Sequence, residues 1–430
     1  MSFSLSFKLR QHTPILHFQH DQPGATLRAT EVKPCLDKFL IQNLGKELTQ
    51  KWLIGAGAHP ALDYKIRFIN GKYRPDIPLP TKTKPDRDGR LRYYTNPEMF
   101  PQVLANMGGK DTARELKHFR MYESLRVEIF SLYEDLIEAL KKSIPAFFAV
   151  HNFGNRKSKG FGSFYLDPSD PLYKKPEVAL REAKDFAKGS LLFWEIEADL
   201  PIADLFWDID IIYRLLKSGF NFPDHPMKDI GAGRKAPDFD KKLDFATYQP
   251  SFLKTYFLNK FKLGSEKRAI KESLFRPEVR IKPDSALKDN QYIRGILGTA
   301  EFFEYRDKER KGIVKITSNE VERFQSAITF KVFNDRIFIL PGSWKDIEGK
   351  SFVFSTERDR TRSVSVPRAD TVGFNLRTFL TDFANYFNTM KDDEVERLDD
   401  IIQDLGRRRP TPDLIKKYLN CLENVQLQTL

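Results

Sequence analysis

The sequence is poor in cysteine and has no long uninterrupted run of apolar residues. Two cysteines in 430 residues, Cys35 and Cys421, exclude a disulfide scaffold and the cysteine-rich zinc modules. No stretch approaches the roughly 18 apolar residues that a transmembrane helix needs. The first residues also lack the basic segment and apolar core of a secretory signal. The composition therefore predicts a cytoplasmic protein with no membrane partner.

Acidic residues are outnumbered by basic ones. Lysine and arginine total 71 against 59 aspartates and glutamates, which gives a net charge of +12. This excess predicts a polyanionic partner, most often nucleic acid. Aromatic residues make up 13% of the chain and phenylalanine alone occurs 36 times, so wholesale disorder is excluded.

The apolar periodicity predicts short strands that alternate with helices in small groups. The longest apolar stripe predicts a helix from Asp111 to Ser143 that ends near Pro145, followed by a buried strand from Ala146 to His151. Other strands are expected over 3–9, 62–69, 191–196, 327–333 and 336–340, the last two as a hairpin around Asn334 and Asp335. Other helices are expected over 30–44, 203–217, 292–303, 374–405 and 412–422.

This order of elements, with long irregular insertions, predicts an α+β fold. Two ferredoxin-like halves fit the pattern. The length suggests two to three domains at about 100–200 residues each. A segment over 219–240 is rich in glycine, proline and aspartate, so we expect an N-terminal domain over 1–220 and a C-terminal domain, partly helical, over 221–430.

The segment Gly154–Phe164 is the strongest candidate for a functional site. It combines three glycines with three cations and contains no acidic residue. Glycine lets the backbone approach a ligand, successive N–H groups can cradle a phosphate, and nearby aromatic rings can stack on bases. A glycine hairpin without a ligand is the structural alternative. The candidate RNA-binding residues here are Gly154, Arg156, Lys157, Lys159, Gly160, Phe161 and Gly162.

Other basic segments are weaker candidates. Arg358, Arg360, Arg362 and Arg368 lie in a segment rich in serine and threonine, and this density is typical of phosphate contacts. The segments 82–92 and 231–235 fit RNA contacts or solvated loops equally well. We interpret the three arginines over 407–409 as structural, at a helix end.

A few histidines suggest metal or catalytic chemistry. His17, His20 and Asp21 could ligate a transition metal, but their segment is predicted as strand and loop, which does not favour a site. In an RNA-cleaving enzyme, His20 or His151 could be the general base, with Asp21 as a further candidate and Arg156 or Lys159 as phosphate stabiliser. A structural role is the alternative for each of them. No cofactor and no small-molecule substrate is predicted.

The glycine-rich segment, G-N-R-K-S-K-G-F-G-S, resembles the glycine-rich loop of the RAMP superfamily (repeat-associated mysterious proteins), whose members are subunits of CRISPR effector complexes. The strand Phe7–Pro14 and the helix entry Ala25–Leu36 resemble the start of the same fold. Tyr292–Gly298 and Arg323–Val332 resemble segments of the larger type III subunits. The sequence departs from the family over 17–24, where many relatives are richer in glycine.

The resemblance implies RRM-like (ferredoxin-like) domains in a type III, Cmr-type effector complex of antiviral defence. The expected partners are guide RNA, target RNA and other effector subunits, and the expected role is RNA binding without catalysis. Arg28 and Lys33 at the helix entry are implied as RNA-backbone contacts. A metal-independent RNA endonuclease of the same superfamily and a scaffold protein with an incidental basic surface are the alternatives.

Overall fold

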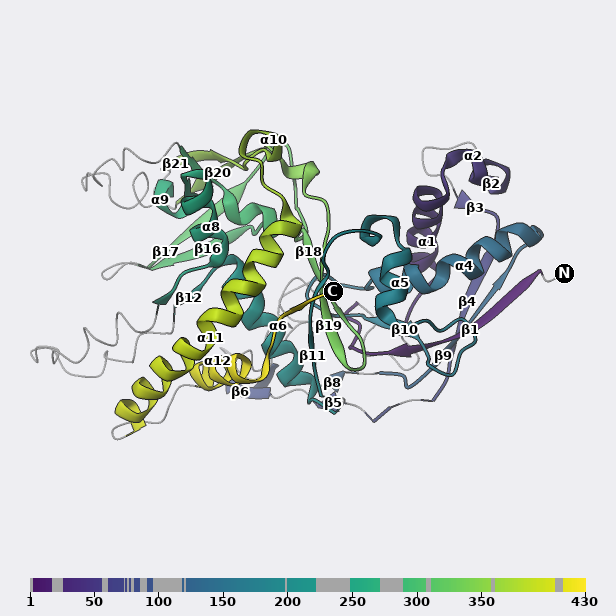
Figure 1. Cartoon of the computed structure of the whole chain (residues 1–430), viewed down its shortest axis with the longest axis horizontal. Helices are drawn as coiled ribbons and strands as arrows, with labels where there is room; N and C mark the ends of the chain where they lie inside the picture. Colours follow the sequence, from purple (N-terminus) through teal and green to yellow (C-terminus); the bar gives the residue numbers. More distant parts are fainter. Residues whose placement is uncertain are drawn as a thin grey trace, which may run out of the picture. The chain divides into compact units, whose positions relative to one another are not determined.

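The computed structural model describes residues 3–17, 26–55, 61–72, 74–75, 77–78, 81–85, 91–95, 118–119, 121–197, 199–221, 248–270, 289–306, 311–356, 360–406 and 413–430. Figure 1 shows its helices and strands. The chain forms two compact units, each built from non-contiguous segments. Unit 1 comprises Met1–Ile209, Thr329–Leu340 and Gln428–Leu430, and unit 2 comprises Asp210–Ile328 and Pro341–Leu427. Helices and antiparallel sheets occur together, so the predicted α+β class is confirmed.

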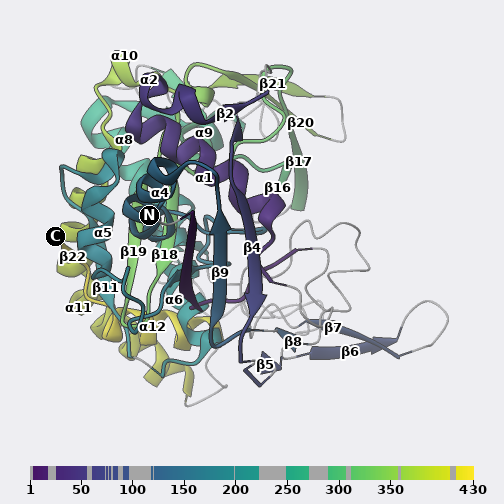
Figure 2. The same ribbon diagram turned by 90° about the vertical axis from the view of Figure 1, so that its right-hand side faces the viewer.

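Unit 1 contains a four-stranded antiparallel sheet with the strand order β10-β1-β9-β4. Along the chain, two helices alternate with its strands in the order β–α–β–β–α–β. Figure 2 shows β9 between β1 and β4. The elements are β1 (Ser4–Gln11), α1 (Ala29–Leu44), β4 (Lys65–Asn70), β9 (Leu125–Phe130), α4 (Glu134–Val150) and β10 (Phe164–Leu166).

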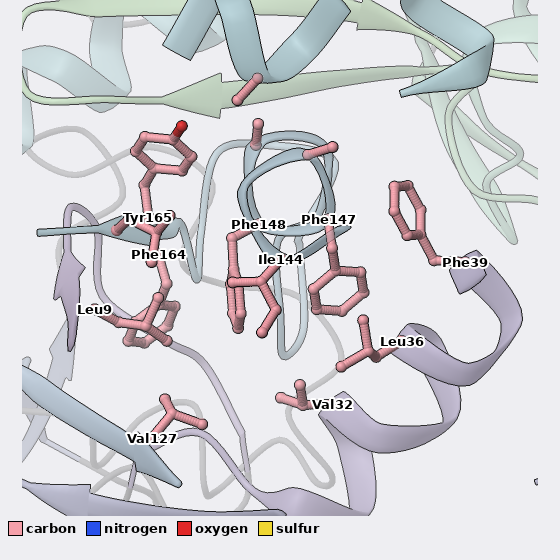
Figure 3. Close-up of a cluster of buried hydrophobic side chains, with 14 of the residues drawn as sticks. Leu9, Val32, Leu36, Phe39, Val127, Ile144, Phe147, Phe148, Phe164 and Tyr165 are labelled. Atoms are coloured by element: carbon pink, nitrogen blue, oxygen red, sulfur yellow. The ribbon is translucent and has the colours of Figure 1, made fainter. Parts of the chain in front are cut away.

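The two helices cover one face of this sheet. Successive side chains of a strand point to opposite faces, so Phe7 and Leu9 of β1 are buried while Ser6 and Lys8 are exposed. Phe147 and Phe148 of α4 meet at 5.0 Å between ring centroids. Figure 3 shows these rings among side chains from α1 and the strands. The core of unit 1 therefore lies between the sheet and the helix pair.

The helix predicted from Asp111 to Ser143 is wrong. Residues 101–117 lie outside the described residues, β9 occupies Leu125–Phe130, and α4 begins at Glu134 and continues through Pro145 to Val150. The apolar residues of β9 alternate, and β9 pairs with both β1 and β4, so sheet pairing decides the conformation there. The strand predicted from Ala146 to His151 is also wrong, since α4 continues to Val150. Burial of the last turns of α4 outweighs the helix-breaking tendency of Pro145.

A second sheet has the order β18-β19-β11-β22. It contains the predicted hairpin of β18 (Ile328–Val332) and β19 (Arg336–Pro341), which is confirmed. Its other strands are β11 (Leu192–Glu195) and β22 (Gln428–Thr429). The helices α5 (Pro176–Glu182) and α6 (Ile202–Lys217) lie before and after β11 in the sequence.

Unit 2 contains a four-stranded antiparallel sheet whose strands follow one another in sequence order, β16-β17-β20-β21. Residues 292–303 form a short 3-10 turn, η5, and the start of β16, so the helix predicted there is wrong; the turn ends at Gly298, whose φ is +102°. The elements are η5 (Ile293–Leu297), β16 (Phe302–Arg306), β17 (Lys311–Thr317), β20 (Ser351–Ser355), β21 (Thr361–Ser365), α8 (Phe252–Phe261), α9 (Glu266–Ile270), α10 (Ala369–Val372), α11 (Leu376–Gly406) and α12 (Asp413–Asn424).

Short elements complete the described chain. They are α2 (Lys46–Thr49), η1 (Gln50–Trp52), β2 (Leu53–Ile54), β3 (Ala61–Leu62), β5 (Ile77–Pro78), β6 (Thr81–Pro85), β7 (Leu91–Thr95), β8 (His118–Phe119), η2 (Lys184–Phe186), β12 (Phe220–Asn221), β13 (Tyr248–Gln249), β14 (Leu263–Ser265), β15 (Asp289–Gln291) and η6 (Lys345–Ile347). Among the described residues, no helix has both the length and the hydropathy needed to cross a membrane.

Candidate functional site

The glycine-rich loop lies between α4 and β10 in unit 1, and its glycines are required by its shape. Gly154, Gly160 and Gly162 all have positive φ. A Cβ atom on Gly162 would lie 1.8 Å from the carbonyl oxygen of Phe153, and one on Gly154 would lie 2.7 Å from the carbonyl oxygen of Leu16. Any larger residue at these positions would collide with backbone, so the glycines serve close backbone packing.

Many of the loop's backbone N–H groups donate to acceptors within the protein. Phe153 N donates to Gly162 O at 2.9 Å, Asn155 N to Leu16 O at 2.6 Å, and Gly162 N to Pro14 O at 2.8 Å. These groups cannot also cradle a phosphate. For these residues, the cradle of N–H groups predicted from the sequence is therefore wrong.

Side chains also fix the loop to β18. Asn152 Nδ2 donates to Phe330 O at 2.8 Å and to Lys157 O at 2.7 Å, while Ser163 Oγ donates to Val332 O at 2.6 Å. The backbone of Phe330 in turn donates to Ser158 O at 3.2 Å. The loop is consequently held at its base and along its returning arm.

Lys331 bridges the two ends of the loop, and no sequence pattern marked it as a site residue. Its side chain is fully buried, and its Nζ donates to His151 O at 2.7 Å and to Phe164 O at 3.0 Å. These two carbonyls stand at the two ends of the loop. Burial holds the pKa of Lys331 well below its usual value.

The aromatic residues of the loop belong to the core. Phe153, Phe161 and Phe164 are buried, and Phe161 stacks on Phe206 with ring centroids 4.0 Å apart and an interplanar angle of 17°. A ring in this position cannot stack on a base without leaving the core. The stacking predicted for Phe161 is therefore wrong for this structure. Lys159 is buried as well.

The part of the loop that reaches solvent is its tip, Gly154–Ser158, with Arg156 and Lys157. Arg156 adopts a left-handed conformation with a φ of +55°, which is uncommon for a residue other than glycine. Gly154 N donates to Glu31 Oε1 at 2.6 Å, which fixes the tip to the first turn of α1. Arg28 immediately precedes that turn.

Lys157 lies close enough to act electrostatically on the same helix. Burial raises the pKa of the Cys35 thiol, and the positive charge of Lys157 opposes this shift. The structure thus brings Arg28, Arg156 and Lys157 into one region, at the start of α1. These three residues came from two separate predictions, the loop and the helix entry.

Lys33 does not join this group. Its Nζ donates to Asp37 Oδ2 and to Leu62 O, both at 2.8 Å, and lies 4.2 Å from the ring centroid of Tyr64. An ammonium with these partners is already neutralised and hydrogen-bonded inside the protein. The geometry therefore gives Lys33 a structural role in holding α1 against its neighbours, in place of the RNA contact that was predicted.

The predicted arginine segment belongs to unit 2. Arg360 and Arg362 are exposed, and Arg362 lies on β21. Arg358 lies outside the described residues, as do His20, Asp21, the segment 231–235 and the arginines over 407–409. The side chains over 82–92 also lie outside the described part, although β6 includes Lys82 and Lys84.

His151 is held by its neighbours. Its Nδ1 lies 2.9 Å from the carbonyl oxygen of Phe147, and its ring centroid lies 5.7 Å from that of Phe39. Burial lowers its pKa from 6.5 to about 4, and the charge of Lys331 acts in the same direction. His17 is buried. Within the described ranges, no group of His, Cys, Asp and Glu side chains could hold a metal ion.

Comparisons with known proteins give consistent matches. The family model of the Cmr1 N-terminal domain matches residues 2–220, and that of the Cmr1 C-terminal domain matches residues 248–405. A solved structure, Cmr1 from Pyrococcus furiosus in its apo form, is 12% identical; the match covers 50% of this chain and 72% of that one, with a TM-score of 0.33. No curated protein sequence matches the chain.

Proposed function

The chain belongs to the Cmr1 family of type III (Cmr-type) CRISPR effector subunits, within the RAMP superfamily, and from this premise we propose that it binds RNA without cleaving it. It would hold the guide RNA, or the guide–target duplex, in antiviral defence. Base pairing would supply the sequence recognition, because contacts to phosphates carry no sequence information. Its other partners are further subunits of the effector complex.

One observation carries this proposal: a rigidly framed loop presents a cationic tip beside the start of α1. The frame buries the loop's aromatic rings, whereas Arg156 and Lys157 are half-buried and still reach solvent. Arg156 also keeps a left-handed backbone, which costs on the order of 1 kcal/mol and is a feature that gathers at functional sites. Together with Arg28, these cations form a site of the kind that neutralises phosphates.

The topology of unit 1 supports the same proposal. Its β–α–β–β–α–β order and its strand order β10-β1-β9-β4 agree with the ferredoxin-like, or RRM-like, arrangement. RRM domains are a common RNA-binding module. We therefore interpret unit 1 as the first of the two predicted ferredoxin-like halves. For unit 2, whose sheet follows sequence order, the second half stays a prediction.

The absence of catalysis is proposed on the state of His151. A general base works best when its pKa lies near the working pH. His151 packs against the rings of Phe39 and Phe147, and burial lowers its pKa to about 4, which makes it a weak base near neutral pH. The endonuclease alternative therefore rests on His20 and Asp21. Loss of RNA cleavage in His20→Ala or Asp21→Ala would establish that alternative.

The proposal is tested by removing the two tip cations from the full chain. We expect Arg156→Ala/Lys157→Ala to weaken binding of a labelled single-stranded RNA and to reduce its log–log salt slope by about 1.4, or about 0.7 for each phosphate contact. A matched control removes two surface lysines elsewhere in unit 1, Lys141→Ala/Lys188→Ala, and should leave the slope unchanged.

Two outcomes would count against it. If the chain purified from its host carries no RNA and binds none at low salt, the scaffold alternative is correct. If both double variants change the slope equally, binding is a property of net charge, and the loop tip is not the site. Thermal melting of each variant shows whether a loss of binding comes from unfolding.

A further inference from the structure

Among the described residues, the face of the unit 1 sheet that is turned away from α1 and α4 is basic and mostly exposed. We call it the open face. Its side chains alternate along each strand with the core residues of the same strand. Its residues are Ser4, Ser6, Lys8 and Arg10 on β1, Lys65 and Arg67 on β4, and Arg126, Glu128 and Phe130 on β9.

Cations outnumber carboxylates among the described residues of this face. Arg67 and Arg126 share one acidic partner, Glu128. Arg67 Nε donates to Glu128 Oε2, and Arg126 Nε lies 3.5 Å from Glu128 Oε1. Arg10 Nε lies 3.6 Å from Oδ2 of Asp167, the residue that follows β10. Lys8 and Lys65 add two more exposed positive charges. The face therefore carries a local excess of positive charge.

The strand register places two of these cations directly opposite each other. Lys8 on β1 and Arg126 on β9 are Cα partners in the antiparallel ladder. Like charges in such a pair destabilise a sheet. An anion bound between the two side chains would remove that repulsion, so the pair is suited to holding a phosphate.

An aromatic ring lies on the same face. Phe130 is 49% exposed, and its cross-strand partners are Ser4 on one side and Lys65 on the other. A hollow of about 700 Å³ lies here, and Ser4, Ser6, Lys65, Arg67, Glu128 and Phe130 are among its lining residues. An exposed ring beside cations, in a hollow, has the composition of a site that stacks a base and neutralises its phosphate.

We propose that the open face binds a single-stranded segment of RNA. Phe130 stacks on a base, and the cations of the face contact phosphates. Arg126 and Phe130 are four residues apart on β9, about 14 Å along the strand, so several nucleotides fit between them. This inference rests on the proposed function only for the class of ligand, RNA. The residues of the open face are different from those of the loop tip.

The composition of the face favours RNA over a protein partner. The centres of protein–protein interfaces are depleted in lysine and in charge generally. Here Lys8 and Lys65 are exposed, and the side chains of Arg67 and Arg126 are 73% and 57% exposed. A neighbouring effector subunit is the competing occupant of this face. RNA binding and co-purification with other subunits, measured on the same variants, distinguish RNA from a protein partner.

The test uses the full chain and a fluorescent oligouridylate, with binding followed by anisotropy over a range of KCl concentrations. We expect Lys8→Ala/Arg126→Ala to reduce the salt slope by about 1.4. We expect Phe130→Ala to weaken binding about tenfold at every salt concentration with the slope unchanged, and Phe130→Tyr to restore it. The control is again Lys141→Ala/Lys188→Ala, which should bind as the wild type does.

Each contrary result has its own meaning. If the open-face variants bind as the wild type does while Arg156→Ala/Lys157→Ala loses RNA, the inference is wrong and the proposed function stands. If the open-face variants keep RNA but no longer co-purify with other effector subunits, the face is a protein interface and the inference is wrong. If the wild-type chain binds no RNA, both proposals fail.

Discussion

The buried Nζ of Lys331 lies 2.7 Å from the carbonyl oxygen of His151, to which it donates a hydrogen bond. A second bond to Phe164 O means that one side chain of β18 bridges both ends of the glycine-rich loop. The loop's shape therefore depends on a strand that is distant in the sequence. A basic residue outside the loop therefore contributes to the site by positioning it, and burial lowers its pKa.

We expect Lys331→Met to loosen the loop. Methionine fills a similar volume but leaves the carbonyls of His151 and Phe164 without this donor, at a cost of about 1–3 kcal/mol for each group left unsatisfied. Hydrogen exchange over residues 151–166 should rise and the melting temperature should fall. The same substitution at Lys315, exposed on β17, is the control and should change stability by less than about 0.5 kcal/mol. Equal effects of the two substitutions would contradict the prediction.

A second prediction separates backbone strain from steric collision at the loop. Gly162 and Gly373 have nearly the same φ, +66° and +65°, but a Cβ on Gly373 meets nothing within 4 Å. Gly373→Ala should cost only the strain of a left-handed backbone, about 1–2 kcal/mol. Gly162→Ala adds a collision with the Phe153 carbonyl, so it should destabilise the protein by clearly more and reduce RNA binding. The two variants are compared by urea denaturation and by the salt-dependent binding assay.

Local periodicity predicted the elements that carry a single clear pattern. The helices over 30–44, 374–405 and 412–422 and the β18–β19 hairpin are confirmed to within a few residues. In each of these elements the apolar residues repeat regularly enough, or over a long enough stretch, to distinguish a helix from a strand. The position of the glycine-rich loop was also predicted, because its composition is unusual for any regular element.

The prediction failed where two periods overlap. Residues 116–140 have apolar side chains at helical spacing, but Leu125, Val127 and Ile129 also alternate, and pairing with β1 and β4 decided for a strand. The burial of Phe161 and the internal partners of Lys33 could not be predicted either. Both depend on contacts with residues that are remote in sequence or placed by the fold, such as Phe206 and Leu62.

Acid should destabilise unit 1 through two half-buried histidines, His12 and His151. In the unfolded chain His151 takes up a proton near pH 6.5, whereas in the folded protein burial lowers its pKa to about 4. Between these two values the unfolded state binds more protons, so stability falls as pH decreases from 6.5 to 4, by about 1.4 kcal/mol per pH unit for one such group. His12, whose pKa is lowered to about 3 by burial and by the charge of Lys331, acts in the same direction.

His151→Gln should therefore flatten this dependence. Glutamine does not titrate, and its amide can still donate toward the Phe147 carbonyl. The variant should be less stable than the wild type at pH 7, because the packing of the imidazole against Phe39 and Phe147 is lost, and the difference should shrink as the pH falls toward 4. Urea denaturation at pH 7, 6, 5 and 4.5 measures it. His12→Gln serves as the matched variant and should reduce the dependence of the free energy of unfolding on pH by a similar amount. If the free energy of unfolding changes with pH equally in the wild type and in both variants, neither histidine is kept neutral by folding.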